Sequence, residues 1–351
     1  MSTKERYDLL NGGLMRTKII ITYGPMIKDE KILEMAVSIA DIVRINLSHG
    51  SEKEWSAAIE KVRTISKRVG KSTEIMADLP GPKIRIGRLD KRRKIKKGDE
   101  VRFSFGGGAA VPGSIPIEYD LIRYCRPGAA IYVGDGELKL EITKIGKREV
   151  TCRSYFDGII ESRKGLSLEG LEVDAEPPTS EDMELLGFAV ANKCDMVAES
   201  FVRNADNIRK LRSAAKDVKI VSKIERKAAL DSIDEIISES DMVMVARGDL
   251  ALNVGFEKLS QAQRFIIKAA ERGETPFIMA TEVLASMVSK PVPTRAEVSD
   301  ISNAISNNAY AIMLSNETSV GKFPLEAIDM LRSCISEAEH DRMLERSQKE
   351  L

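Results

Sequence analysis

The sequence predicts an α/β protein built on a parallel (β/α)8 (TIM) barrel, with a small all-β domain inserted after strand 3. Short apolar runs alternate with segments of 3.6-residue apolar period along most of the 351-residue chain. The alternation fails once, between Ile84 and Leu166, where short alternating runs and turn signals replace it. A stretch of this length and character is too long for a loop and indicates a separate β domain.

Eight apolar runs are candidates for the barrel strands. They carry Val, Ile and Met on both faces, as expected of parallel strands that are covered on both sides. The runs are Lys18–Tyr23, Ile42–Leu47, Glu74–Asp78, Asp195–Ala198, Val218–Ile224, Asp241–Ala246, Pro276–Ala280 and Ala309–Leu314. Two helices after the insertion have predicted caps, one near Thr179–Asp182 and one at Thr294 with Glu297 three residues on.

The interrupting stretch defines the domain boundaries. Val101–Phe105, Ile131–Val133 and Glu141–Thr143 are its candidate strands, and Gly106–Gly108 is a candidate turn. We predict an N-terminal leader at 1–15, a catalytic barrel at 16–84 and 166–351, and an inserted β lid domain at 85–165.

Composition and charge exclude several classes of function. Lys plus Arg number 54 and Asp plus Glu also number 54, which argues against a general nucleic-acid or membrane-surface binder. The four cysteines have no C-x-x-C spacing, and two histidines are too few for a multi-histidine metal site. No apolar run approaches the roughly 18 residues of a membrane span, and the charged N-terminus does not resemble a secretory signal. These features predict a cytoplasmic protein.

Polar side chains stand at the ends of five predicted strands, where a barrel of this kind collects its active site. Carboxylates can hold a hard divalent cation, and Lys and Arg can neutralise phosphoryl oxygens, so the set suits a phosphorylated, metal-bound substrate. The residues are Arg44, Asn46 and Ser48; Lys223 and Glu225; Arg247, Gly248 and Asp249; Thr281; and Ser315, Asn316 and Glu317.

Each of these residues also has a purely structural explanation. Arg44 or Lys223 alone is more often half of a salt bridge, and Glu225 could simply be the partner of Lys223. Gly248 could be only a turn, and Thr281 only a helix cap. The coincidence of polar ends on five strands favours a site, because a barrel core needs none of them.

A basic run, Lys91, Arg92, Arg93, Lys94, Lys96 and Lys97, lies in the predicted insertion. It could bind nucleic acid, but no aromatic residues are interleaved with it for base stacking. We therefore favour a solvated hairpin and expect no nucleic-acid partner.

Nine stretches, in order, resemble the pyruvate kinase family. They are Arg16–Ile19, Thr22–Pro25, Arg44–Gly50, Gly81–Arg85, Ser222–Glu225, Met244–Leu250, Ala280–Glu282, Pro293–Glu297 and Met313–Thr318. Each alone is a weak motif, but together, from about residue 16 to 339, they are specific. The resemblance implies glycolytic transfer of a phosphoryl group from phosphoenolpyruvate to ADP, giving ATP and pyruvate.

The resemblance also implies roles for single residues. Glu225 and Asp249 would bind Mg²⁺ or Mn²⁺, and Lys223 would stabilise the phosphoryl group in flight and the enolate. The backbone N–H groups of Gly248 and Asp249 would hold the substrate carboxylate, and Thr281 would place the proton-donating water. The other implied contacts are Ser315 and Glu317 in the proton-relay region, Arg44, Asn46 and Arg85 at the phosphates, and Lys164 at the nucleotide when the lid closes.

Lys83 is the most informative departure from the family. The chain reads Leu79-Pro80-Gly81-Pro82-Lys83 where potassium-dependent members have Thr-Lys-Gly-Pro-Glu, and potassium-independent relatives carry Lys at this position. The Lys83 ammonium would then replace the monovalent cation in a region formed with Asn46, Ser48 and Asp78. K⁺ is therefore expected not to be required.

Two further departures concern the chain end and the surroundings of the site. The chain stops at Leu351, where family members continue into a domain that holds an effector site and a subunit interface. We therefore expect no activation by fructose 1,6-bisphosphate and a homo-oligomer assembled through the barrel. Four local substitutions, Tyr23, Ala251, Glu282 and Asn316, are expected to affect substrate affinity and rate.

Two other functions remain open at this point. A barrel lyase or aldolase acting on pyruvate would also use a Glu and Asp metal pair, although such enzymes lack the inserted β domain. A catalytically silent paralogue kept for binding is the non-enzyme alternative. The presence of Lys223, Glu225, Asp249 and Thr281 disfavours it.

Overall fold

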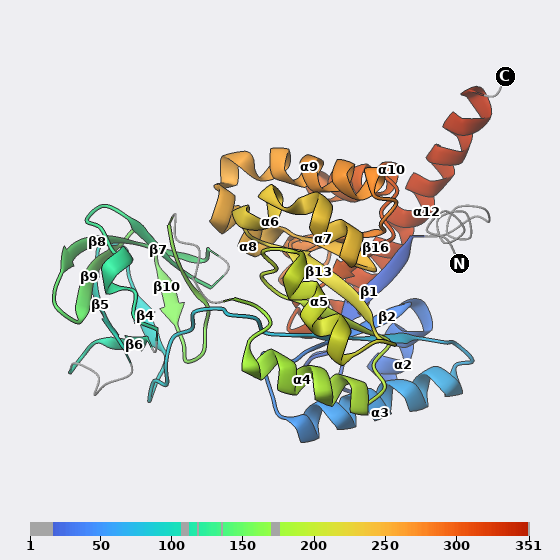
Figure 1. Cartoon of the computed structure of the whole chain (residues 1–351). Helices are drawn as coiled ribbons and strands as arrows, with labels where there is room; N and C mark the ends of the chain where they lie inside the picture. The colour runs from blue at the N-terminus through green and yellow to red at the C-terminus, as the bar shows by residue number, and fades with distance from the viewer. Residues whose placement is uncertain (1–16, 107–111, 118, 135, 170–175, 350–351) are drawn as a thin grey trace. The chain divides into compact units, whose positions relative to one another are not determined.

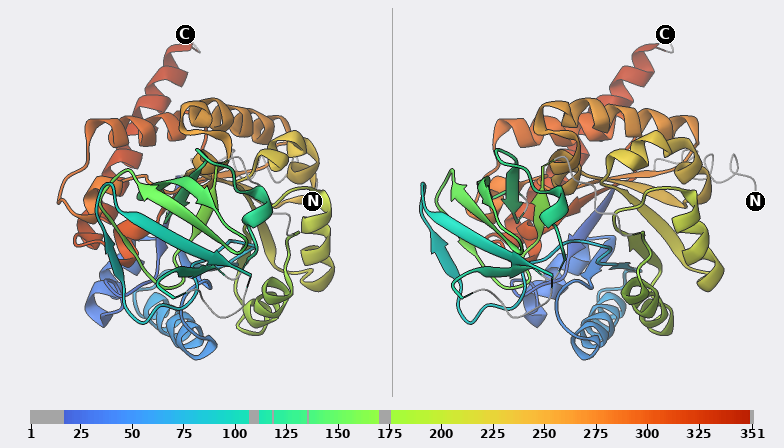
Figure 2. Two further views of the ribbon diagram at one scale, coloured as in Figure 1. Left: turned by 90° about the vertical axis from the view of Figure 1, so that its left-hand side faces the viewer. Right: turned by 60° about the vertical axis from the view of Figure 1, so that its left-hand side comes forward.

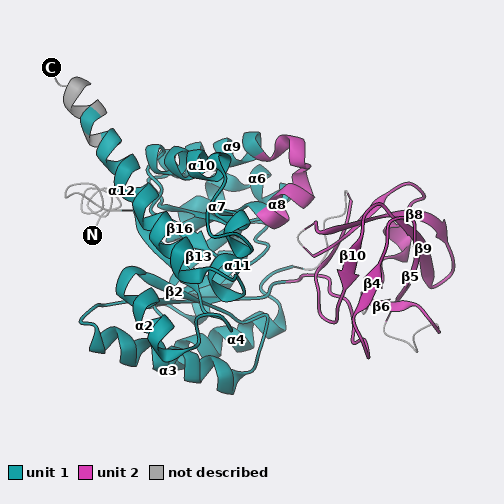
Figure 3. Cartoon of the chain, turned by 180° about the vertical axis from the view of Figure 1, so that it is seen from behind, with its two compact units in different colours: residues 1–81, 176–247, 260–351 teal, residues 82–175, 248–259 magenta. Residues whose placement is uncertain are grey.

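The computed structural model describes residues 17–106, 112–117, 119–134, 136–169 and 176–349. The chain divides into two compact units, shown in teal and magenta in Figure 3. The first contains Met1–Gly81, Glu176–Arg247 and Ser260–Leu351, and the second contains Pro82–Ala175 and Gly248–Leu259. The predicted leader at 1–15 and Arg16 lie outside the described residues.

The first unit is built on a closed barrel of parallel strands, which confirms the predicted fold class (Figure 1). The strands follow one another around the barrel in the order of the chain, as in a (β/α)8 barrel. The strands are β1 Lys18–Thr22, β2 Ile42–Asn46, β3 Glu74–Asp78, β12 Met196–Glu199, β13 Lys219–Ile224, β14 Met242–Ala246, β15 Phe277–Ala280 and β16 Ala311–Leu314. Each overlaps one of the eight predicted runs.

An apolar cluster fills the barrel interior and determines where the polar side chains emerge. Met76 and Val221 belong to this cluster. Side chains two residues apart on a strand point the same way, so Asp78 and Lys223 continue these inward rows at the carboxyl ends of β3 and β13. The same alternation that buries the core therefore directs charged groups to the mouth of the barrel.

Helices surround the strands of the first unit (Figure 2). Thr179 and Asp182 form a capping box at one helix and Thr294 and Glu297 at another, as predicted. The helices are α2 Glu30–Ile39, α3 Glu52–Arg68, α4 Ser180–Ala191, α5 Ala205–Ala214, α6 Lys227–Asp231, α7 Ile233–Glu239, α8 Arg247–Val254, which continues into the second unit, α9 Leu259–Arg272, η3 Ala285–Val288, α10 Arg295–Ser306, α11 Asn316–Ser319 and α12 Pro324–Lys349.

The second unit contains the all-β domain. A six-stranded sheet has the order β11-β7-β8-β9-β5-β6, and β10 pairs with β4. Its core includes Phe103, Leu140 and Cys152, all fully buried. The strands are β4 Arg93–Ile95, β5 Glu100–Phe105, β6 Ile115–Ile117, β7 Ala130–Val133, β8 Leu138–Ile145, β9 Glu149–Ser154, β10 Gly158–Ile160 and β11 Leu166–Leu168, with short helices η1 Ile122–Tyr124 and η2 Phe256–Lys258.

The basic run of the insertion lies on and beside β4. Lys94 is exposed and stands opposite Ile159 in the ladder with β10. Acidic residues accompany it, because the Asp157 carboxylate accepts a hydrogen bond from the Lys97 N–H at 2.8 Å, and that of Asp99 accepts one from the Lys96 N–H at 2.8 Å. This mixed charge fits the expectation of a solvated surface. The expected hairpin is wrong, because β4 pairs with β10, which lies far along the chain.

Candidate active site

The Asp78 carboxylate is the centre of the charged cluster at the mouth of the barrel. Asp78 is 1% exposed and ends β3. The Arg44 guanidinium contacts its Oδ2 at 2.6 Å, and the Lys223 ammonium contacts its Oδ1 at 3.2 Å. Burial alone would raise the pKa of Asp78, but the charges of Lys223 and Arg44 outweigh that effect and hold the pKa below its ordinary value. Asp78 is therefore an anion that aligns two cations.

Lys223 has three acceptors around its ammonium, which matches its three N–H donors. Besides Asp78, it contacts Oε1 of Glu225 at 3.2 Å and donates to the Ser200 hydroxyl at 2.7 Å. Ser200, 2% exposed, in turn donates to the Leu79 carbonyl at 2.7 Å. Sequence reasoning missed Ser200. Its position directly after a predicted strand, two residues beyond an inward-facing alanine, was the available signal.

Glu225 is held rigidly as well. Its Oε2 accepts a hydrogen bond from the Phe201 N–H at 2.7 Å, and the residue is 2% exposed. Phe201 has a φ of +60°, which is uncommon for a residue with a side chain. This turn directs the Phe201 N–H to the carboxylate, so the end of β12 orients a side chain that follows β13.

Thr281 and Glu282, which follow β15, both adopt the left-handed region, with φ of +63° and +54°. For residues other than glycine this conformation costs about 1–2 kcal/mol each. Arg247 stabilises the turn by donating from Nη2 to the Thr281 carbonyl at 2.6 Å, and its Nη1 pairs with Asp300. Strain of this kind concentrates at functional sites, which favours Thr281 as part of the site. The sequence placed Arg247 at the end of a strand but gave it no role, and the structure shows that it supports this turn.

Two residues after β16, Glu317 and Ser315, differ in the hydrogen bonds of their side chains. Glu317 is buried, and its two oxygens accept the N–H groups of Leu284 at 3.1 Å and Ser315 at 2.7 Å. Glu317 therefore fixes the loop that follows Thr281. The buried Ser315 hydroxyl has no hydrogen-bond partner among the described residues, which leaves it available to a ligand.

Lys83 and Asp249 form an ion pair within the second unit. The Lys83 ammonium lies 2.8 Å from Oδ1 and 2.9 Å from Oδ2 of Asp249. The side chains are 15% and 16% exposed. We expected Lys83 to lie beside Asp78 in the monovalent-cation region. Asp78 belongs to the first unit and Lys83 to the second, so this placement stays a prediction. The carboxylate that Lys83 contacts within its own unit is that of Asp249.

The other predicted residues have local partners. Asn46 accepts the Ser48 N–H at 3.1 Å, which shapes the turn after β2. Arg85 donates to the Arg163 carbonyl at 3.1 Å, and the Lys164 ammonium pairs with Glu137, all within the second unit. Gly248 lies in the first turn of α8, and Ser48 is half-buried after β2.

Two carboxylates, Glu225 and Asp249, are candidates for holding a divalent cation. Each by itself offers the hard oxygen donors that Mg²⁺ and Mn²⁺ prefer: Glu225 follows β13 in the first unit, and Asp249 lies in the first turn of α8 in the second unit. Each already faces an ammonium, Lys223 or Lys83, so each presents oxygen to a cation. Within the described part of the chain, no group of three or more His, Cys, Asp or Glu side chains is placed to hold a metal, so a substrate or water would have to complete the coordination.

Glu199 is a buried acid that the sequence did not single out. It ends β12, is 0% exposed, and neither carboxyl oxygen has a hydrogen-bond partner among the described residues. Met196 and Ala198 face the barrel interior, so the alternation turns Glu199 outward. Burial, and then the negative charge of Asp182, raises the pKa of Glu199 well above the ordinary 4.5, although Lys223 opposes this shift.

This acid should weaken the fold as the pH rises. Because the folded pKa exceeds the unfolded pKa near 4.5, the free energy of unfolding falls as pH increases from 4.5 through the folded pKa. We expect Glu199→Leu to raise the free energy of unfolding by about 1–3 kcal/mol at pH 7, and by less at pH 4.5. Urea unfolding at both pH values measures this. Glu271→Leu on the exposed face of α9 is the control, and an equal gain at both pH values would contradict the assignment.

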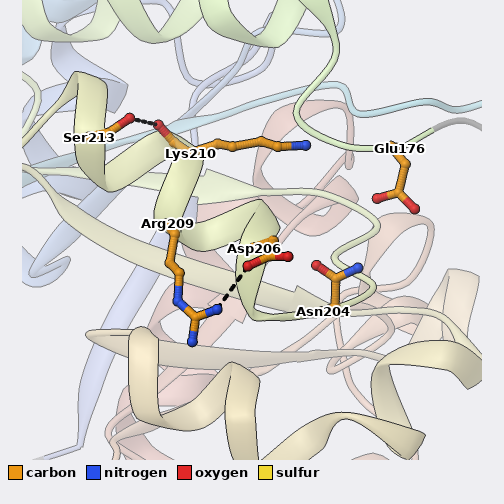
Figure 4. Close-up of a pocket in the computed structure, with 6 residues that line it drawn as sticks. All are labelled: Glu176, Asn204, Asp206, Arg209, Lys210 and Ser213. Atoms are coloured by element: carbon orange, nitrogen blue, oxygen red, sulfur yellow. Dashed lines mark hydrogen bonds and ion pairs between the residues drawn. The ribbon is translucent and has the colours of Figure 1, made fainter.

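A cavity of about 550 Å³ lies elsewhere on the first unit, at α5 (Figure 4). None of its lining residues belongs to the predicted site, and Arg209 there is paired with Asp206 at 2.8 Å. The lining consists of Glu176, Asn204, Asp206, Arg209, Lys210 and Ser213.

Among the described helices, none has both the length and the apolar character needed to cross a membrane.

Cations and carboxylates gathered at the carboxyl ends of barrel strands, together with a β domain between the third and fourth strands, define a barrel enzyme suited to anionic substrates. Residues 14–328 match the family described as "Pyruvate kinase, barrel domain".

Individual relatives agree with the family match. The chain is 35% identical over 334 residues to a pyruvate kinase from Thermococcus litoralis, covering 93% of this chain and 70% of the relative. It is 36% identical to one from Agrobacterium vitis, covering 92% and 69%, and 35% identical to one from Staphylococcus saprophyticus, covering 93% and 57%. The chain therefore belongs to the pyruvate kinase family, and is a transferase of that type.

Proposed function

We propose that this chain transfers the phosphoryl group of phosphoenolpyruvate to ADP, giving ATP and pyruvate. The observation that carries the proposal is the Arg44–Asp78–Lys223–Glu225 cluster at the barrel mouth. Two cations fixed by buried carboxylates form a preorganised site for a phosphoryl group whose charge is spread over its oxygens in the transition state. Preorganisation matters because the cations need not reorient during the reaction.

The individual roles follow from this arrangement. Lys223 would neutralise charge on the phosphoryl group and then on the enolate oxygen left when the P–O bond to the enol breaks. Arg44 would contact the phosphoryl oxygens. Glu225 and Asp249 would hold a divalent cation, which would neutralise further negative charge on the substrate. Two residues would serve the protonation step, Thr281 and Ser315. Three would contact the nucleotide: Asn46, Arg85 and Lys164.

Protonation of the enolate carbon is assigned to the side of the site that carries Thr281. The Thr281 hydroxyl donates to the Ala280 carbonyl at 2.7 Å, which fixes its orientation. Its oxygen can then accept a hydrogen bond from one O–H of a water. The other O–H of that water gives its proton to the carbon, and a proton from solvent neutralises the hydroxide that is left. Glu317 acts here as a positioning residue, because both its oxygens hold backbone N–H groups of the surrounding loops.

The decisive experiment is a turnover assay of the purified chain. Phosphoenolpyruvate, ADP and Mg²⁺ should yield pyruvate and ATP in equal amounts. Formation of pyruvate without ATP would favour another barrel enzyme, and no product at all would favour a catalytically silent paralogue.

We further propose that the activity needs no K⁺ and does not respond to fructose 1,6-bisphosphate. Lys83 supports the first point, because its ammonium is a cation that is covalently tethered to the chain. The second point stays a prediction, and rates measured with and without the sugar phosphate test it directly. Rates measured with Na⁺ or K⁺ as the only monovalent cation, with and without the sugar phosphate, should agree within about twofold. A homo-oligomer formed through the barrel also stays a prediction, which light scattering tests.

A further inference from the structure

Lys83 binds the same carboxylate that the proposed function gives to the divalent cation. Its ammonium contacts both oxygens of Asp249, at 2.8 and 2.9 Å. The ammonium thus places its positive charge next to both oxygens of the carboxylate. A metal ion needs at least one of these oxygens at about 2.0–2.1 Å, and a divalent cation at that distance repels an ammonium bound to the same carboxylate.

The surrounding backbone is shaped to admit the Lys83 side chain. Gly165 is buried, and a Cβ built on it would lie 2.5 Å from Cε of Lys83 and 3.4 Å from its Nζ. Only glycine leaves space for the side chain in this position. The Gly165 backbone is itself fixed, since its carbonyl accepts the Gly134 N–H at 2.9 Å and the following Leu166 N–H bonds to the Ile84 carbonyl at 2.9 Å. The strands around Lys83 therefore hold its side chain against Asp249.

Asp249 is also fixed from its own side. It lies in the first turn of α8, and its carbonyl accepts a hydrogen bond from the Asn253 side chain at 2.9 Å. The Asp249 side chain and the Lys83 side chain are both about five-sixths buried, so solvent screens the pair only partly. Low exposure and two short contacts both favour the paired form over the separated form.

From this geometry we propose that Lys83 is a built-in competitor of the divalent cation, which occupies Asp249 until the metal displaces it. The proposal rests on the proposed function, because it takes Asp249 as a metal ligand. If the pair is formed about nine-tenths of the time, the apparent metal affinity of the substrate-free enzyme falls about tenfold. Metal binding and release of the Lys83 ammonium are then one event, so the freed ammonium becomes available elsewhere in the site only when the metal is in place.

Mn²⁺ binding to the substrate-free enzyme, followed by the electron paramagnetic resonance of free Mn²⁺, tests this without reference to turnover. Lys83→Met should tighten Mn²⁺ binding about tenfold. Gly165→Ala keeps the Lys83 charge but crowds its side chain, and should tighten binding by about threefold or more. Lys258→Met removes one exposed charge from the same short segment as Asp249 and should change the affinity by less than twofold.

The outcomes separate this proposal from the proposed function. If Lys83→Met and Gly165→Ala both bind Mn²⁺ as the wild type does, Lys83 is not a competitor, whatever the activity. If Lys83→Met and Lys258→Met tighten binding equally while Gly165→Ala has no effect, the change is a general effect of charge and the proposal is wrong. Asp249→Asn tests the metal site itself, and Mn²⁺ affinity unchanged in that variant would overturn the assignment of Asp249 as a ligand.

Discussion

Lys223→Met is expected to lower kcat for pyruvate formation by at least about 10³-fold. In the folded protein, the Lys223 ammonium is held by Asp78, Glu225 and Ser200 at 3.2, 3.2 and 2.7 Å. It is therefore positioned before the substrate arrives, and preorganised charge of this kind contributes factors of about 10²–10³ per donor in other enzymes. A lysine that serves both the phosphoryl group and the enolate should exceed that range.

The loss should appear in kcat more than in KM, because charge on the enolate develops only during the reaction. Lys219→Met is the matched control, since Lys219 starts the same strand but pairs with Glu74 and is 46% exposed. We expect that variant to stay within about twofold of the wild type. Thermal unfolding of both variants shows whether Asp78 and Glu225, left with fewer cations, disturb the fold. A folded Lys223→Met enzyme with undiminished kcat would remove Lys223 from the chemistry.

Alternation along the strands explains why much of the site could be predicted. Arg44 and Lys223 lie two residues beyond inward-facing apolar side chains, so the period of two places both at the barrel mouth. Ser200 has the same relation to Ala198, but a serine after a strand carries no distinctive chemical signal. Its role becomes visible only through the 2.7 Å contact with Lys223.

Other features could not be predicted because they depend on tertiary contacts. Lys83 and Asp249 are 166 residues apart in the chain, and no local pattern relates them. Glu199 is an exception to the rule that carboxylates without a partner stay exposed. The alternation along β12 turns its side chain toward the helices, and neighbouring side chains bury it there. Arg247 shows a third case, in which a side chain in a recognisable motif turns out to support the strained turn at Thr281.

Lys83→Glu is expected to make the activity depend on K⁺. Replacing the ammonium by a carboxylate removes the tethered cation that the metal would release from Asp249, and it adds an oxygen donor that can bind a diffusible cation. Without a bound cation, the added carboxylate also repels the carboxylate of Asp249. Without K⁺ we expect the variant to lose at least about 10²-fold in kcat/KM for phosphoenolpyruvate, and K⁺ should restore about tenfold or more by supplying the charge that Lys83 carried.

Steady-state rates at constant ionic strength, with K⁺ replaced by Na⁺ or tetramethylammonium, measure this dependence. Lys83→Met is the matched variant, because it removes the tethered cation without adding a carboxylate to bind a diffusible one. It should lose activity without regaining much of it in K⁺, so the ratio of the two responses separates loss of charge from loss of the cation site. Equal activity of Lys83→Glu in both salts would show that this position does not govern monovalent-cation use, whereas rescue by K⁺ alone would show that one tethered ammonium replaces a diffusible ion.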